Sequence, residues 1–88
     1  MKKYFLSYNP LTKHYYLDYG CFDRSRQDLG KMRGEDLLEK LKEILPLHRQ
    51  IMIYSQKDMD KSIQDILEEG FKNTRINMEF IKNLSRLC

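Results

Sequence analysis

Residues 34–55, GEDLLEKLKEILPLHRQIMIYS, decide the fold expected of this chain because they join a helix to a buried strand. In the first half, leucine and isoleucine recur at helical spacing, at positions 37, 38, 41, 44 and 45. Glu35 and Asp36 lie in the first turn, where acidic side chains complement the helix dipole, and Pro46 stops the helix. We therefore predict a helix over residues 34–45.

The second half ends in QIMIYS, residues 50–55, a short apolar run bounded by polar residues. Such a run is typical of a central strand that is buried on both faces. Downstream we predict a second helix over 59–70, with Asp58 as its cap and Gly70 at its end. Its apolar face is formed by Met59, Ile63, Ile66 and Leu67.

Beyond this helix, Ile76, Met78 and Phe80 alternate with polar residues, which predicts a strand over 76–80. The tail that begins at Ile81 is expected to add a last helical turn. Because a helix between two strands is normally a right-handed crossover, the strands at 50–55 and 76–80 should run parallel.

Upstream, residues 3–8 and 13–19 are rich in the aromatic side chains that suit a half-buried strand. Between them, NPLT opens with Asn9-Pro10, a strong turn signal, so an antiparallel hairpin is expected. Residues 20–33 show neither the helical nor the strand periodicity of apolar residues, so we expect a long connection there. The prediction is an α+β single domain over residues 1–88, with a mixed sheet and the element order β-β-α-β-α-β.

Composition limits the function. The 88 residues are 41% hydrophobic and 33% charged, as in an ordinary soluble domain, and the net charge of +3 is spread along the chain. Nucleic acid is not an expected partner, because its binding needs a concentrated basic face. No apolar run approaches the roughly 20 residues of a membrane helix, and the N-terminal stretch lacks the apolar core of a signal peptide. We expect a cytoplasmic protein without membrane contact.

The two cysteines, Cys21 and Cys88, are far apart and have no CxxC or histidine-rich neighbourhood. Neither a disulfide nor a metal site is expected from that pattern.

One stretch resembles a known family. Residues 16–41, YLDYGCFDRSRQDLGKMRGEDLLEKL, resemble the cofactor-binding motif of the GNAT acyltransferases, in which a strand leads through V-D-P-x-x-R/Q-x-x-G-x-G/A into a helix. Phe22-Asp23 stand where V-D would be, Gln27 at the R/Q position and Gly30 at the first glycine. The later Gly70-Phe71 is similar to the family's LGF turn.

The chain departs from the pattern at two positions. Met32 occupies the second glycine position, with Gly34 as the candidate replacement. Ile66 stands where the family often has a tyrosine that serves as the general acid. The family's acceptor-binding half has no counterpart upstream in this sequence.

The resemblance implies that the protein binds acetyl-CoA. The pyrophosphate would lie where the loop meets the helix, because backbone N–H groups there lack helical partners and glycine permits close approach. The implied cofactor-binding residues are Tyr19, Cys21, Phe22, Gln27, Gly30, Arg33 and Gly34. An ordinary turn and helix start remains the alternative, since residues 23–36 carry four basic and four acidic side chains.

The resemblance also implies an N-acetyltransferase that passes the acetyl group to an amine of a small molecule or protein. Such a reaction needs a base for the amine, backbone donors for the oxyanion and an acid for the leaving thiolate. Asp18 is the candidate base and Tyr54 the candidate acid, with the N–H groups of residues 19–21 as donors. Both side chains also have a simpler reading, Asp18 as a solvent-facing carboxylate and Tyr54 as a core aromatic ring. Cys21 as a nucleophile would need a nearby base, and its simpler reading is a half-buried packing cysteine.

Two other classes of protein compete with the acetyltransferase reading. A GIY-YIG endonuclease has a similar element order, but KKY and YYL stand where its glycines would be. The stronger alternative is a non-catalytic interaction protein: an inhibitor, a regulator or an obligate dimer. Its interface would use the tyrosine-rich hairpin, because tyrosine is enriched in protein interfaces. The hairpin tyrosines are Tyr4, Tyr8, Tyr15, Tyr16 and Tyr19.

Overall fold

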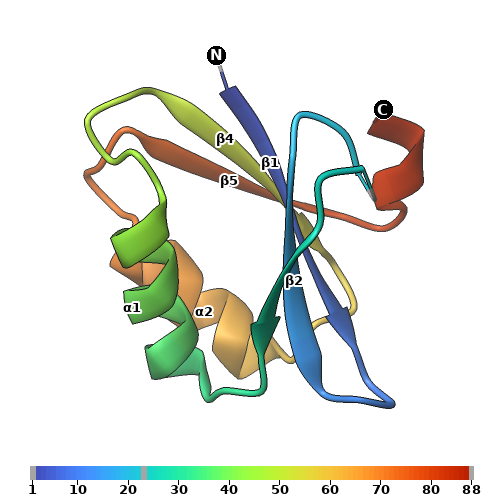
Figure 1. Cartoon of the computed structure of the whole chain (residues 1–88). Helices are drawn as coiled ribbons and strands as arrows, with labels where there is room; N and C mark the ends of the chain where they lie inside the picture. The colour runs from blue at the N-terminus through green and yellow to red at the C-terminus, as the bar shows by residue number, and fades with distance from the viewer. Residues whose placement is uncertain (1, 23, 88) are drawn as a thin grey trace.

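The computed structural model describes residues 2–22 and 24–87, which form a mixed five-stranded sheet with two α-helices on one of its faces (Figure 1). The α+β class is as predicted. Across the sheet the strand order is β3-β2-β1-β4-β5. In chain order the elements are β1 (Lys2–Asn9), β2 (His14–Tyr19), β3 (Gln27–Gly30), α1 (Gly34–Ile44), β4 (Ile51–Gln56), α2 (Lys61–Gly70), β5 (Ile76–Ile81) and the short 3₁₀ helix η1 (Leu84–Leu87).

The predicted hairpin is confirmed. β1 and β2 pair antiparallel, from Tyr4 opposite Tyr19 to Asn9 opposite His14. In the turn, the Asn9 side-chain oxygen accepts a hydrogen bond from the N–H of Leu11 at 2.9 Å, which is the self-bonding expected of asparagine before a proline turn.

The expectation that residues 20–33 lack regular structure is wrong. Gln27–Gly30 form β3, which pairs antiparallel with β2 and shifts register between Tyr15 and Tyr16. Leu29 is the one buried side chain of this strand. Four residues with a single apolar side chain show no period, so the pairing partner and not the local pattern makes this segment a strand.

The parallel half of the sheet is also as predicted, since β4 runs parallel to β5. β4 also runs parallel to β1, with Tyr4 opposite Ile53. The connection α1 leads from β3 to β4, which are separated in the sheet by β2 and β1, whereas α2 links the neighbours β4 and β5.

Burial of β4 on both faces was expected, and that expectation is corrected. Ile51, Ile53 and Ser55 are buried, whereas the alternate residues Met52 and Tyr54 are half-exposed. The reason is that α1 and α2 cover the same face of the sheet (Figure 1).

The second helix begins later than predicted. α2 starts at Lys61, and its cap is Asp60, whose side chain accepts a hydrogen bond from the N–H of Ser62 at 2.9 Å. Asp58 instead accepts from the side-chain amide of Gln56. Met59 is buried although it precedes the helix. Because it is apolar and in phase with the helical pattern, the predicted helix began two residues too early.

The main core lies between this sheet face and the helices. It contains Leu6, Tyr15, Leu17, Leu29, Leu37, Leu41, Leu45, Ile51, Ile53, Met59, Leu67, Phe71 and Ile76. Two glycines allow α1 and α2 to pack closely. A Cβ atom on Gly34 would lie 2.7 Å from Cδ1 of Ile66, and one on Gly70 would overlap the side chain of Leu38.

We call the other side of the sheet, away from α1 and α2, the open face. It is partly covered, because η1 lies on that side and contacts β4 (Figure 1). Phe5 and Asp18 are fully buried there, and the Phe5 ring stacks on Tyr54 with 5.6 Å between centroids. These residues alternate along the strands with the core residues Leu6, Leu17 and Ile53, which point to the helices.

Candidate functional site

Gly30, the first motif glycine, ends β3 with φ of +85°, a conformation that favours glycine. Its N–H group donates to Asp28 Oδ1 at 2.8 Å, and Nδ1 of His14 lies 3.0 Å from the same carboxylate. The hydrogen bonds from His14 and Gly30 lower the pKa of Asp28. The backbone donor that a pyrophosphate would use at Gly30 therefore already has an anionic partner.

Gly34 opens α1 and is buried. The side chains of Ile66 and Ile63 fill the space beside it, with Ile66 Cδ1 at 2.7 Å from a Cβ built there. Helix packing alone is thus a sufficient reason for glycine at this position. Arg33 is the residue that caps α1, and its side chain makes no capping hydrogen bond.

A cavity of about 440 Å³ lies beside the start of α1, on the helix side of the sheet. Three of the side chains that line it are basic, namely Lys13, Lys31 and Arg33, and one is acidic, Asp36. The remainder of the lining is Tyr8, Tyr15, Met32 and Ile63. Lys13 comes from the β1–β2 turn, so the fold adds a cation that is distant in sequence to those of the β3–α1 segment.

The candidate base lies elsewhere. Asp18 is fully buried on the open face, which overturns its reading as a solvent-facing carboxylate. Its oxygens accept from Nε and Nη2 of Arg26, each at 3.4 Å. The guanidinium also lies over two rings, 4.8 Å from the centroid of Tyr16 and 5.4 Å from that of Phe22. Burial of this carboxylate is offset by a cation that itself stacks on aromatic faces.

Tyr54, the candidate acid, is also on the open face, where its ring stacks on Phe5. Asp18 and Tyr54 are both register neighbours of Phe5, on β2 and β4. They flank one buried ring, on the side of the sheet opposite the cavity beside α1. The structure thus does not bring the candidate catalytic residues together with the basic side chains that line this cavity.

The other predicted binding residues are spread out. Tyr19 is 46% exposed with its ring against Tyr4 at 5.0 Å between centroids, and Gln27 is exposed on β3. The Gly20 N–H donates to the Lys3 carbonyl at 2.9 Å, so this candidate oxyanion donor is used within the sheet. Asp23 of the motif lies outside the described residues.

Cys21 corrects another expectation. It is disulfide-bonded, whereas the sequence pattern predicted no disulfide. The spacing of cysteines along the chain does not indicate which sulfurs bond, so the pattern gave no signal of this disulfide. Cys88 lies outside the described residues. A disulfide-bonded sulfur is not a nucleophile, and the reading of Cys21 as a plain packing cysteine is wrong as well.

A second cavity, of about 340 Å³, lies on the open face beside the hairpin turn. Ser7, Tyr16, Phe22 and Arg26 contribute to its lining. The Ser7 hydroxyl is buried and has no hydrogen-bond partner within the described part of the chain. Ser7 is a small polar residue between Leu6 and Tyr8, and nothing in that local sequence marks it as part of a site.

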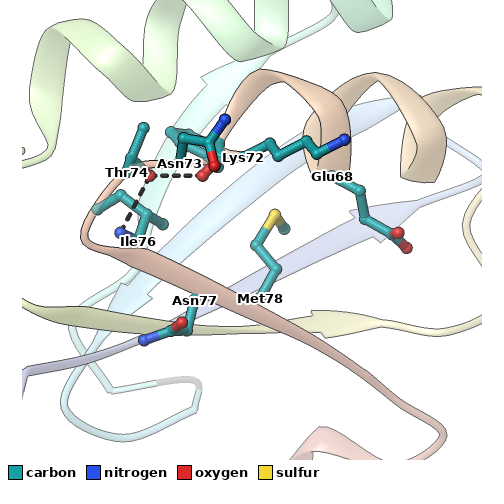
Figure 2. Close-up of a pocket in the computed structure, with 8 residues that line it drawn as sticks. Glu68, Lys72, Asn73, Thr74, Ile76, Asn77 and Met78 are labelled. Carbon is teal, nitrogen blue, oxygen red and sulfur yellow. Dashed lines mark hydrogen bonds between the residues drawn. The ribbon is translucent and has the colours of Figure 1, made fainter.

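A third hollow, of about 400 Å³, lies where α2 ends and β5 begins. Figure 2 shows Glu68 and Lys72 on the helix side of it, with Met78 below them and Asn77 across the strand. Thr74 is fixed here: its hydroxyl donates to the Phe71 carbonyl at 2.6 Å and accepts from the N–H of Ile76 at 3.1 Å. This hollow borders an edge strand of the sheet, a feature that the sequence analysis did not identify.

Comparisons with known proteins add no relative, since no family model, no curated protein and no solved structure matches this chain. Within residues 2–22 and 24–87, no helix is long and apolar enough to cross a membrane. The same residues contain no group of three or more His, Cys, Asp or Glu side chains arranged to hold a metal ion.

Proposed function

We propose that this protein binds a phosphate-bearing ligand of the acyl-CoA type in the cavity beside α1. The observation that supports this is the gathering of Lys13, Lys31 and Arg33 around about 440 Å³, against the single carboxylate of Asp36. In the segment 23–36 the charges balance, but the fold adds Lys13 and leaves the cavity with an excess of positive charge.

The residues present fit the anionic part of such a ligand. Lysine and arginine hold phosphate as point charges and as a planar fork, respectively. The two tyrosines of the lining, Tyr8 and Tyr15, offer aromatic surface to the remainder of the molecule. The glycines Gly30 and Gly34 are not part of this proposal, because a carboxylate and a helix contact already explain them.

The proposal is limited to binding. Acetyl transfer to an amine through Asp18 and Tyr54 would require these residues to reach a ligand on the other side of the sheet. Asp18 also accepts from Arg26 and is fully buried, so it is poorly placed to take a proton from an amine.

Thermal unfolding with millimolar acetyl-CoA, CoA or ADP tests the proposal. A ligand at about 100 times its dissociation constant adds about 2.7 kcal/mol, and a domain of this size shifts by about 4 to 8 °C per kcal/mol. We expect a shift of about 10 to 20 °C with CoA compounds, and a similar shift with ADP if the diphosphate alone is recognised.

Lys31→Glu should remove most of that shift, because it replaces a cation of the cavity with an anion. Lys42→Glu is the matched control, since Lys42 is an exposed lysine in the last turn of α1 and does not line the cavity. No shift with any of the three compounds, or an equal shift in the Lys31 and Lys42 variants, refutes the proposal.

The second candidate function is a non-catalytic protein that binds another protein. It is favoured by the state of the candidate base, because Asp18 is fully buried and accepts hydrogen bonds from Arg26. Release of the CoA thiol from acetyl-CoA in the presence of amines would contradict this candidate.

A further inference from the structure

β5 is an edge strand with a row of outward backbone groups. The carbonyls of Arg75 and Ile81 accept from the N–H groups of Ile51 and Lys57 on the β4 side, at 3.1 and 2.9 Å. In a parallel ladder, alternate residues bond to the same neighbour, so the odd-numbered residues of β5 face β4. The backbone groups of Met78 and Phe80 and the Ile76 carbonyl therefore point away from the sheet, whereas the Ile76 N–H donates to the Thr74 hydroxyl at 3.1 Å. Such an edge is a template for another strand.

The two edges of the sheet differ in how they are protected. β3 has four residues, lies next to a register shift and ends at a glycine with positive φ. β5 has six residues in unbroken register with β4 and contains no proline. Short, irregular edges discourage pairing, whereas a regular edge of this length permits it.

Arg75 and Glu79 carry opposite charges on this edge, so two copies of the edge can pair with each other. When β5 pairs antiparallel with β5 of a second copy, even-numbered residues must oppose even-numbered ones, because these carry the outward groups. With Asn77 opposite Asn77 on the symmetry axis, Arg75 of each copy lies opposite Glu79 of the other. Among the registers that place even-numbered residues opposite each other, only the one centred on Asn77 pairs Arg75 with Glu79. The register centred on Glu79 opposes two carboxylates, so charge favours the Asn77-centred register.

The same register matches the apolar side chains and the hollow of Figure 2. Ile76 lies opposite Met78 of the second copy, both on the helix side of the sheet. The half-buried Phe80 of the second copy lies opposite Thr74, which lines the hollow of about 400 Å³ between α2 and β5. Pairing would thus fill the hollow with an aromatic ring that is partly exposed in the single chain.

We propose that two copies of this chain associate through antiparallel β5 edges, with Asn77 on the two-fold axis and Arg75 facing Glu79 on both sides. The dimer has one continuous ten-stranded sheet, twice the five strands of one chain. This edge is the contact surface for the second candidate function, a protein that binds another protein. The dimer experiment is independent of the acetyl-CoA binding experiment, because β5 shares no residue with the cavity beside α1.

Sedimentation equilibrium tests the proposal, with an expected limiting mass of twice the 10.7 kDa of one chain. Glu79→Arg should weaken dimerisation by about tenfold or more, because two cross-strand pairs change from attraction to repulsion. Arg75→Glu should do the same, and the double variant Arg75→Glu/Glu79→Arg should restore the dimer. Glu39→Arg, a charge reversal on the exposed side of α1, is the control and should leave the mass unchanged.

A backbone variant tests the edge itself. Met78→Pro removes an outward N–H that makes no bond to β4, so the chain should fold and remain a monomer. Circular dichroism verifies that each variant is folded. A wild-type protein that stays monomeric at millimolar concentration, a dimer that Glu79→Arg does not weaken, or a double variant that remains monomeric overturns the proposal.

Discussion

Gly70 provides the sharpest test of how the helices pack. It is the last residue of α2 and does not have a positive φ, so its backbone does not require glycine. A Cβ atom there would overlap Cγ and both Cδ atoms of Leu38 on α1. Overpacking typically costs about 1 to 3 kcal/mol, and three overlapping atoms, one near the backbone, place this case at about 3.

Alanine also brings a gain, because it is favoured over glycine in a helix by up to about 1 kcal/mol. The expected net effect of Gly70→Ala is therefore a loss of about 2 kcal/mol, or about 8 to 16 °C in Tm. In a Leu38→Ala background, the overlapping atoms are absent and only the gain remains. There the same substitution should stabilise the protein by up to about 1 kcal/mol, which gives a coupling of about 3 kcal/mol.

Urea and thermal unfolding of the four proteins, followed by circular dichroism, measure this cycle. Gly34→Ala is a useful comparison, since the nearest atom to its new Cβ is the flexible Cδ1 of Ile66 at 2.7 Å and the cost should be smaller. If Gly70→Ala changes stability in the same direction with and without Leu38, the close packing of the helices is not the reason for this glycine.

Two further predictions concern single side chains. Burial raises the pKa of Tyr15 to about 12, so its neutral form stabilises the fold below pH 10, and this contribution is lost as the pH rises through 12. The urea midpoint of Tyr15→Phe should consequently fall less steeply than that of the wild type between pH 10 and 12, and parallel curves would count against this reasoning. Asp60→Ala should cost about 0.5 to 2 kcal/mol through loss of the α2 cap, whereas Asp58→Ala should cost less; the reverse order in thermal melts would restore Asp58 as the cap.

The strongly periodic elements were predictable because their signals are local. The hairpin follows from its aromatic strands and Asn9, α1 from its leucine spacing, and the parallel pair β4 and β5 from the helix between them. β3 was missed because hydrogen bonds from β2 make it a strand. The cap of α2 was misplaced because the buried Met59 continues the apolar pattern ahead of the helix.

The candidate site was less predictable, because a resemblance of sequence order places residues along the chain and not in space. Gln27, Gly30, Arg33 and Gly34 are close in sequence, yet Gly30 is held by Asp28 and Gly34 by its helix contact. Lys13 joins the basic cavity from a turn that no motif connected with it. Similarly, Asp18 alternates with tyrosines as a solvent-facing residue would, but the structure buries it against Arg26.

Periodicity and turn chemistry act between residues near one another in the chain, so they were sufficient to predict the α+β class, the hairpin, both helices and the parallel direction of β4 and β5. The packing of distant segments, which no local pattern shows, puts both helices on one face of the sheet and makes β3 and β5 its edges. It also places the cavity beside α1 on one face of the sheet and the candidate catalytic residues Asp18 and Tyr54 on the other, with the candidate cofactor-binding residue Phe22 on the same face as Asp18. These features arise from contacts between distant segments, where side chains alternate across a sheet and each strand has two sides.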